Sequence, residues 1–245
     1  MKRLIIFAAL MLFVASMAMA NGAGLGIKNS PHDFTDNVGP ADGDGDGNPD
    51  VLEVGAGGWN ARVEICRVCH VPHDHGRAVA DVGLLWNHAL SSVTYTMYTS
   101  PTTDGTQDAQ PGGASKMCLG CHDGTVGIDH FDKYTTDNVV IDDYSSGFQV
   151  PGDLAGTSLQ GTHPISIVYD AAADGGLQPT GNTMGTSGTI ASVLPDGKVE
   201  CSSCHDVHDQ ESVANTHLLR VANKGDAATG DMTNASALCL TCHIK

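Results

Sequence analysis

The sequence is short of the side chains from which a protein core is usually built. Aromatic residues make up only 5% of its 245 residues, while glycine occurs 30 times. Large apolar side chains normally supply most of a core, and abundant glycine favours loops. The longest apolar run, from Leu4 to about Val14, is too short to cross a membrane. We therefore expect neither a conventional side-chain core nor a membrane-spanning helix.

Basic residues are also scarce. Lysine and arginine total 12 against 28 aspartates and glutamates, which gives a formal net charge of −16 at pH 7. An acidic surface disfavours binding to nucleic acid and to anionic membranes. It favours solubility and partners that are cationic or contain metal.

The first segment, residues 1–20, has the pattern of a cleavable export signal. A basic pair precedes the apolar run, and the small residues Ala18 and Ala20 close the segment. Basic, apolar and small-residue stretches in this order are typical of secretory signals. We therefore expect an exported mature domain over residues 21–245.

Cysteine is absent except in four copies of one pattern, Cys-x-x-Cys-His, which together use all eight cysteines. Two cysteines three apart can attach both vinyl groups of one haem, and the following His can bind the iron as its proximal ligand. The pattern therefore predicts four covalently bound haem c groups. The cysteines are Cys66, Cys69, Cys118, Cys121, Cys201, Cys204, Cys239 and Cys242, and the proximal histidines are His70, His122, His205 and His243.

Other chemistry fits these motifs less well. A single copy could be a redox-active cysteine pair or half of a zinc site. A disulfide framework would not require a histidine after every second cysteine. Four copies behind an export signal, with no cysteine left over, favour haem attachment over all three alternatives.

A repeat of the whole pattern identifies further iron ligands. Each half of the chain contains a lone His beside proline, then Cys-x-x-Cys-His-x-x-His, then Ser-x-x-Cys-Leu-x-Cys-His. We interpret the halves as two dihaem modules, at about 21–135 and 150–245. The repeat gives four candidate distal ligands, enough for two imidazoles on every iron: His32, His73, His163 and His208.

The remaining histidines have no counterpart in the repeat. His75, His130 and His217 are expected at the surface or at haem edges, and His88 is a reserve ligand because Trp86 beside it suggests burial. A His three residues beyond a proximal His is too close in sequence to reach the opposite face of the same haem. His73 and His208 should therefore bind the irons of haems other than those of their own motifs.

An acidic stretch between residues 42 and 53 has the spacing of a calcium-binding loop. Its oxygen-bearing side chains alternate with glycines, as the hard, seven-coordinate Ca²⁺ ion requires. A solvated acidic loop is the alternative, because aspartate and glycine also favour turns. The candidate ligands of one structural Ca²⁺ are Asp42, Asp44, Asp46, Asn48, Asp50 and Glu53.

The fold class that follows is a multihaem cytochrome c, dominated by loops, with the haem stack as its core. A few short helices are expected at the haem motifs, including Asn60 to His70 and Asn234 to His243. A few short strands are expected, among them Pro164 to Tyr169. Residues 171–199 are predicted to be a surface excursion. A hairpin formed by Thr189–Leu194 and Lys198–Glu200 is predicted around Pro195 to Gly197.

Segments through most of the mature chain resemble extracellular tetrahaem c-type cytochromes that form filaments, the OmcE-like cytochrome nanowires. The segments that carry this resemblance are Ser30-Pro31-His32-Asp33-Phe34, Cys66–His73, Leu85–His88, Ser115–Val126, Gly161–Tyr169, Cys201–His208 and Leu218–His243. The resemblance implies a coil-dominated fold, bis-His haems in a continuous chain, and subunits stacked head to tail. It also implies that one iron takes its distal His from a neighbouring subunit, and His32 is the candidate donor.

The leading functional hypothesis is extracellular electron transfer without enzymatic activity. Its partners would be other copies of the chain, other redox proteins, and extracellular metal oxides or electrodes. A soluble periplasmic electron shuttle is the alternative. A multihaem reductase would need an iron with an open axial position, and eight predicted imidazoles for four irons leave no iron short of a ligand.

Overall fold

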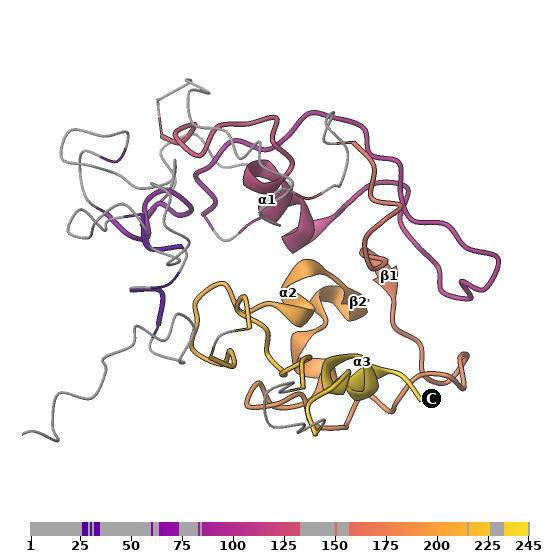
Figure 1. Ribbon diagram of the computed structural model, residues 1–245. Coiled ribbons are helices and arrows are strands. Elements are labelled where there is room, and N and C mark those ends of the chain that lie inside the picture. The colour runs from indigo at the N-terminus through magenta and orange to yellow at the C-terminus, as the bar shows by residue number, and fades with distance from the viewer. Residues whose placement is uncertain are drawn as a thin grey trace, which may run out of the picture.

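A computed structural model describes residues 26–28, 30, 32–34, 60, 64–73, 83, 85–132, 150, 157–214, 216–225 and 233–244 (Figure 1). Loops dominate this part of the chain, as the glycine content predicts. The predicted export signal, the calcium-type loop at 42–53 and His75 lie outside the described residues. No helix among the described residues is long and apolar enough to cross a membrane.

The helices and strands are few and short. They are α1 (Gly113–His122), β1 (Ile167–Val168), the 3-10 helices η1 (Ile190–Val193) and η2 (Pro195–Gly197), β2 (Lys198–Val199), α2 (Cys201–Cys204) and α3 (Ala237–Cys242). Each of the three α-helices carries a cysteine motif. Helical structure in the described residues is therefore concentrated where haem attachment is predicted.

A single helical turn recurs in the motifs. The backbone N–H of the motif histidine donates to the carbonyl of the first cysteine at 2.8 Å for His70, 3.0 Å for His205 and 2.9 Å for His243. This i to i−4 bond is the α-helical one, and it needs only the five residues of the motif. The longer helix predicted from Asn60 to His70 is wrong where it is described, because residues 65–69 form turns.

The small sheet corrects another prediction. β1 and β2 pair antiparallel, with Ile167 opposite Val199 and Val168 opposite Lys198. The segment predicted to pair with β2, residues 189–194, instead contains η1. Thr189 and Ser192 close a capping box at the start of this 3-10 helix, so the local chain favours a helical turn over a hairpin strand.

Two small clusters of buried apolar side chains lie among the described residues. The larger is formed by Tyr95, Met97, Leu119, Leu159 and Ile165, with Cys201 packed against it, and the smaller by Phe34, Val68 and Phe131, with Cys69 packed against it. In each case a motif cysteine lies at the edge of a cluster. The few large side chains of this sequence are thus placed next to the predicted attachment sites.

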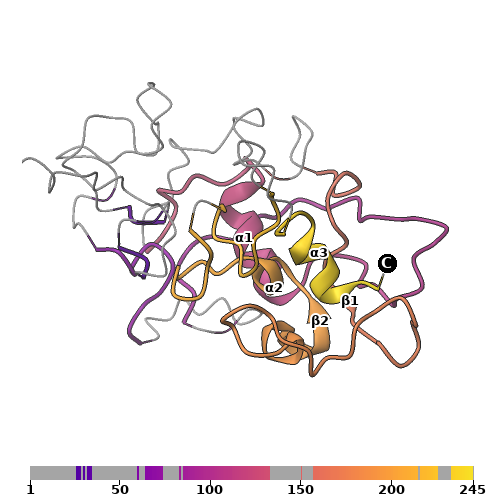
Figure 2. The ribbon, with the colours of Figure 1, turned by 60° about the horizontal axis from the view of Figure 1, so that its bottom comes forward.

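The three motif helices lie in chain order. In Figures 1 and 2 the order is α1, α2, α3 in both views, with α2 in the middle. The excursion at 171–199 returns to the last of them, because Gln178 N donates to Cys242 O at 2.8 Å and Ile244 N donates to Gly176 O at 2.8 Å. Tyr169 Oη donates to Cys242 O at 3.1 Å. The surface excursion therefore packs along the C-terminal motif.

Candidate functional site

All eight cysteines are free. The disulfide framework, one alternative from the sequence, is therefore absent from the structure. Cys66 and Cys239 are exposed and the other six are partly buried. The sulfurs thus remain available for the thioether bonds that the motifs predict.

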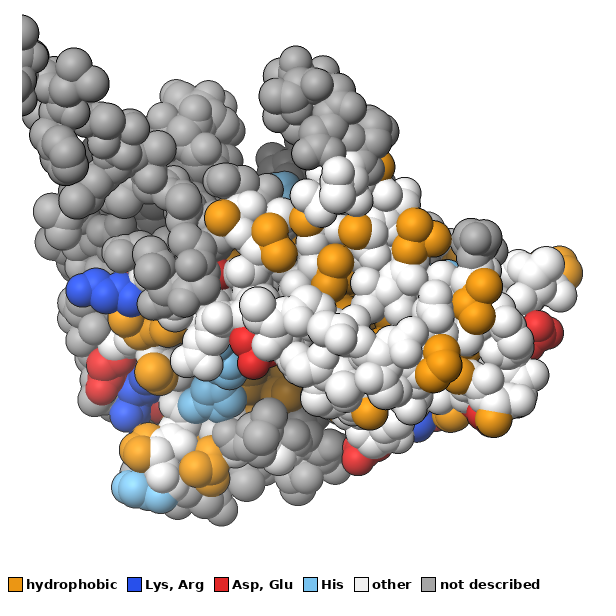
Figure 3. All heavy atoms as spheres, turned by 90° about the horizontal axis from the view of Figure 1, so that it is seen from below, with side chains coloured by type: hydrophobic (Ala, Val, Ile, Leu, Met, Phe, Trp, Pro, Cys, Tyr) orange, Lys and Arg blue, Asp and Glu red, His pale blue; other side chains and the backbone are white. Residues whose placement is uncertain are grey.

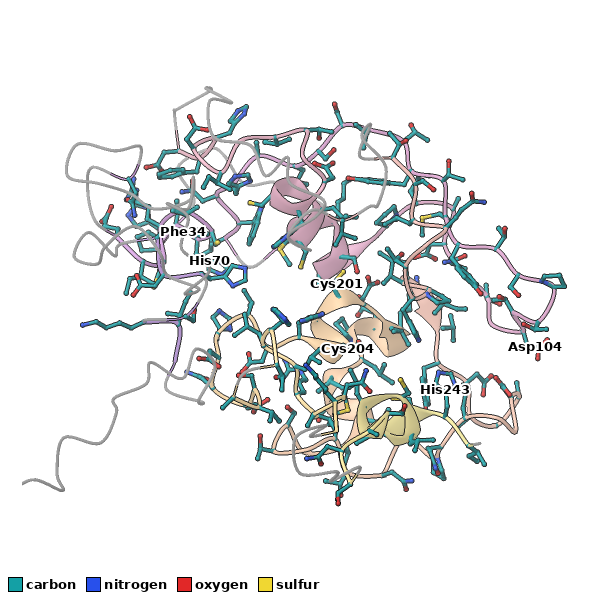
Figure 4. The ribbon with its side chains drawn as sticks, viewed as in Figure 1. Phe34, His70, Asp104, Cys201, Cys204 and His243 are labelled. Carbon is teal, nitrogen blue, oxygen red and sulfur yellow. The ribbon has the colours of Figure 1, made fainter. Side chains whose placement is uncertain are left out.

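The four cysteine pairs follow one another in space in their sequence order. Cys69 of the first motif lies close enough to Cys121 of the second for their thiols to interact electrostatically. The Cys118 thiol hydrogen-bonds that of Cys201 in the third motif, and Cys204 neighbours Cys242 of the fourth. Figure 4 shows Cys201 between α1 and α2, with His70 to one side and His243 at α3. The motifs therefore form a continuous series.

Burial and neighbouring groups change the acidity of several motif thiols. Burial raises the pKa of Cys69 to about 12 and that of Cys204 to about 11. The pKa of Cys201 is lowered, mainly by its hydrogen bond with Cys118. Redox-active cysteines and zinc ligands act as thiolates. Burial keeps the thiols of Cys69 and Cys204 protonated at neutral pH, whereas the Cys201 thiol is more acidic than usual.

Predicted proximal and distal histidines lie together in three pairs. The ring centroids are 6.1 Å apart for His32 and His122, 6.5 Å for His70 and His208, and 6.2 Å for His163 and His243. Each pair joins one proximal histidine to one candidate distal histidine. The pair of His70 and His208 also connects the two halves of the chain.

The spacing within these pairs matches that of two imidazoles on one metal ion. An imidazole–metal bond is about 2.0 to 2.1 Å long, and a ring centroid lies about 1.1 Å beyond the bonding nitrogen, so opposite ligands have centroids about 6.3 Å apart. The three observed distances lie within a few tenths of an ångström of this value. The residues present therefore fit an iron with two axial histidines.

Hydrogen bonds and burial constrain the rings of several candidate ligands. Nδ1 of His163 lies 2.9 Å from Pro164 O, and Nδ1 of His205 lies 2.9 Å from His217 O. A ring that donates from Nδ1 to a carbonyl keeps its lone pair on Nε2. Burial lowers the pKa of His32 to about 3, so this ring is neutral at pH 7. Metal ligation requires neutral imidazole.

One ring nitrogen of the candidate ligand His32, Nδ1, is buried without a hydrogen-bond partner among the described residues. A buried polar nitrogen without a partner is costly. The ring lies beside His122 of the same chain.

His88 is held in a different way from the candidate ligands. The residue is fully buried, with Nδ1 2.7 Å from Ala89 O and Nε2 2.9 Å from Gly127 O. Both nitrogens are thus directed at backbone carbonyls, which only accept hydrogen bonds. His88 Nε2 also lies 3.4 Å from Cys121 Sγ of the second motif, so the reserve role of His88 as an iron ligand stays a prediction.

Five histidines among the described residues are exposed: His73, His163, His205, His208 and His217. On the face drawn in Figure 3, histidine side chains reach the surface next to hydrophobic ones. No group of three or more His, Cys, Asp or Glu side chains in the described ranges is arranged to hold a bare metal ion. Haem iron takes only its two axial ligands from the protein, so the histidine pairs suffice for it.

A structural repeat joins the first and third motifs to segments that the sequence did not relate. Val71 N donates to Leu85 O at 3.0 Å, and Asp206 N donates to Leu218 O at 2.8 Å. Leu85 and Leu218 both have positive φ, 53° and 61°. Val71 and Asp206, which directly follow the histidines of the first and third motifs, are therefore hydrogen-bonded to equivalent turns. The turns at Leu85 and Leu218 share only this leucine. The repeat of residue types in the sequence therefore could not show that the two turns are equivalent.

Two chemically different side chains then perform the same task. Asn87 N donates to Cys69 O and Arg220 N to Cys204 O, both at 2.9 Å. The side chain of Asn87 donates to Arg67 O at 2.5 Å, and Nε of Arg220 donates to Ser202 O at 3.0 Å. Both side chains thus bond the carbonyl of the residue that follows the first cysteine. They hold the cysteine turn in place, a role that sequence analysis missed.

A buried carboxylate joins the second motif to the third. Glu200 is 4% exposed and accepts hydrogen bonds from the hydroxyls of Ser115 and Ser166, the latter at 3.1 Å. Ser115 Oγ in turn accepts the backbone N–H of Cys201 at 3.0 Å. The serine of the Ser-x-x-Cys-Leu signature therefore fixes α1 against α2.

Replacing Glu200 by glutamine should flatten the pH dependence of stability. Burial raises the pKa of Glu200 in the folded protein, against the hydrogen bonds from Ser115 and Ser166. The folded state therefore binds this proton more tightly than the unfolded state, and its contribution to stability falls as pH rises above about 4. Glutamine keeps an acceptor oxygen but carries no charge.

The measurement is the thermal midpoint of Glu200→Gln and the native protein between about pH 4 and pH 7. The variant is expected to gain stability relative to the native protein as pH rises. Asp196→Asn, at an exposed position, is the control for loss of one negative charge and should show no such gain. A parallel pH profile for Glu200→Gln and the native protein would contradict the role of burial at Glu200.

The chain was also compared with known proteins. No protein-family model matches it, and no match is found among curated proteins.

Proposed function

We propose that this protein is an exported electron-transfer protein that carries four covalent haem c groups and catalyses no reaction of its own. The observation that carries the proposal is the set of three histidine pairs, each with one Cys-x-x-Cys-His histidine at the spacing of axial ligands. When bound, haem supplies reversible one-electron chemistry. The chain's own residues attach the groups, hold the two axial imidazoles and set the order of the sites.

Electron transfer is favoured over a reductase by the ligand set. Two imidazoles on an iron leave no coordination position for a substrate. His163 and His205 keep Nε2 for a metal because their Nδ1 atoms lie against carbonyls. The arrangement therefore suits reversible oxidation and reduction without a bound substrate.

Conduction along the chain is supported by the series of cysteine pairs. Each pair contacts or neighbours the next in the order first, second, third, fourth. An electron entering at one end can then pass through successive haems to the other. The first and fourth motifs are the expected points of exchange with partners.

We further propose that the chain is the subunit of an extracellular filament that passes electrons to metal oxides, electrodes or other redox proteins. Support comes from the export signal and from the resemblance to OmcE-like cytochrome nanowires. A head-to-tail contact between unlike surfaces produces an open filament. The acidic composition, with a formal charge of −16, suits cationic or metal acceptors.

The test is to express the full chain in a host that attaches haem c and to purify the mature protein. We expect a mass that includes four haems and a magnetic resonance spectrum that is low-spin for all irons. Electron microscopy should show filaments. A high-spin iron in the native protein would favour a reductase, monodisperse particles at high concentration would favour a soluble shuttle, and absence of haem would overturn the proposal.

A further inference from the structure

Trp86, beside the first motif, has a buried polar atom without a partner. The residue is 9% exposed, and its indole Nε1 has no hydrogen-bond partner among the described residues. A buried N–H without an acceptor is costly, so a buried tryptophan normally finds one. We propose that Trp86 Nε1 donates a hydrogen bond to a propionate of the haem attached at the first motif, an inference that rests on the proposed function.

The indole of Trp86 lies against the histidine of the first motif. The rings of Trp86 and His70 meet edge to face, with centroids 5.6 Å apart and planes at 87° to each other. The backbones of the two residues also form an antiparallel bridge. His70 is the predicted proximal ligand of the first haem, so the indole is fixed next to the predicted site of that haem.

The other ring beside the indole has its own hydrogen-bond partners. The centroids of Trp86 and His88 are 6.5 Å apart. Nδ1 of His88 lies 2.7 Å from Ala89 O, and its Nε2 lies 2.9 Å from Gly127 O. Both nitrogens of His88 thus face carbonyl groups, and neither is an acceptor for the indole N–H. The acceptor is therefore expected from a bound group.

A haem propionate suits this donor better than a water molecule does. A buried water needs at least two polar partners, and the other orphaned atom nearby is Asn87 Oδ1. Successive side chains of an extended segment point to opposite faces, and the contact of Trp86 with His88 places these two on the same face. Asn87 is then on the other face, so one water cannot serve both atoms. A carboxylate accepts a strong, charge-assisted hydrogen bond by itself.

The equivalent position at the third motif carries no donor. His205 forms with Leu219 the same antiparallel bridge that His70 forms with Trp86. Leucine has no polar side-chain atom, so the third haem lacks the hydrogen bond proposed for the first. Trp86 therefore makes two haem sites different although their motifs are held by the same backbone arrangement.

The expected consequence is a higher reduction potential at the first haem. The positive end of the indole N–H bond offsets part of the negative charge of the propionate. Reduction lowers the positive charge of the iron by one, so less negative charge nearby favours the reduced state. Hydrogen bonding around the group is one means by which a protein sets the potential of a haem. Loss of the N–H should therefore lower one potential of four.

The experiment compares Trp86→Phe, which keeps an aromatic ring but loses the N–H, with Leu219→Met at the equivalent position. The host makes haem from 5-aminolevulinate labelled with carbon-13 at its carboxyl group, which labels the propionates. In Trp86→Phe we expect four attached haems, a shift of one labelled carboxylate resonance in the reduced protein, and a lowering of one reduction potential. Leu219→Met should change neither the labelled resonances nor the potentials.

Unchanged carboxylate resonances in haem-loaded Trp86→Phe protein would overturn the hydrogen bond, as would an equal shift in Leu219→Met. Trp86→Leu, which installs the residue type of the third motif, should give the same shift if the phenylalanine variant folds poorly. In native protein labelled with nitrogen-15, the indole proton of Trp86 should exchange slowly with solvent, and rapid exchange would identify water as its partner and overturn the proposal. If no haem is attached to the native chain, the proposed function itself is wrong.

Discussion

Replacing Cys239 and Cys242 together by alanine is expected to yield a protein with three haems in place of four. The two cysteines are the predicted attachment points of the fourth motif, and without the thioether bonds that haem would not be retained covalently. Haem absorbance per chain should fall by about one quarter. Mass spectrometry of the denatured protein measures the number of attached groups directly.

The control for this change is Thr241→Ala, which lies between the same two cysteines. The Thr241 hydroxyl donates to Ala237 O at 2.9 Å within α3, so its loss alters the helix but not the sulfurs. Four haems are expected in the control. Four haems in the double cysteine variant would disprove attachment at this motif. The proposed series of haems would then lack its last member.

Arg220→Ala is expected to destabilise the fold by about 3 kcal/mol, the usual cost of breaking a buried ion pair from one side. The guanidinium donates to Ser202 O at 3.0 Å, Ser187 Oγ at 2.9 Å and Glu211 Oε2 at 2.6 Å. It also lies 3.9 Å from Asp206 Oδ1, with side-chain exposures of 13% and 7% for the two residues. The third motif is thereby fastened to the 171–199 excursion.

Chemical denaturation followed by circular dichroism measures this loss. Lys224→Ala removes an exposed cation and should change the free energy of unfolding by less than about 0.5 kcal/mol. Arg220→Lys should be intermediate, because lysine lacks the planar fork that reaches several acceptors at once. Equal stabilities for Arg220→Ala and Lys224→Ala would show that the Arg220 contacts do not hold the motif.

Much of the local structure at the motifs could be predicted from sequence. The turn that brings Cys66 and His70 together needs only one i to i−4 hydrogen bond, so five residues contain all the information required. The same is true at the third and fourth motifs. Loop dominance followed equally from composition, because 30 glycines and few aromatic residues limit regular structure.

The errors came where distant segments compete for a partner. β2 pairs with β1, some 30 residues earlier, and not with the adjacent segment at 189–194. The segment from Asn60 to His70 carries a helical pattern, yet turns cover residues 65–69. In this first motif the chain after His70 bonds to the turn at Leu85, a contact that local propensity does not encode.

The residues that hold the cysteine turns, Asn87 and Arg220, could not be identified from the sequence for a similar reason. Asn87 and Arg220 have no chemical likeness, yet each donates a side-chain hydrogen bond to the same carbonyl of its cysteine turn. The two side chains share this role because the backbone has the same conformation in both places, with positive φ at Leu85 and Leu218. A repeat of backbone geometry leaves little trace in residue type.

The sequence by itself determined the attachment chemistry that we propose, because cysteine and histidine spacing is a local, covalent property of the chain. It also identified the eight candidate axial histidines through the repeat. Only the tertiary structure decided which of them meet: His32 with His122, His70 with His208 and His163 with His243. Such pairs depend on long-range packing of loops, and spacing along the chain cannot specify contacts between residues that lie tens of positions apart.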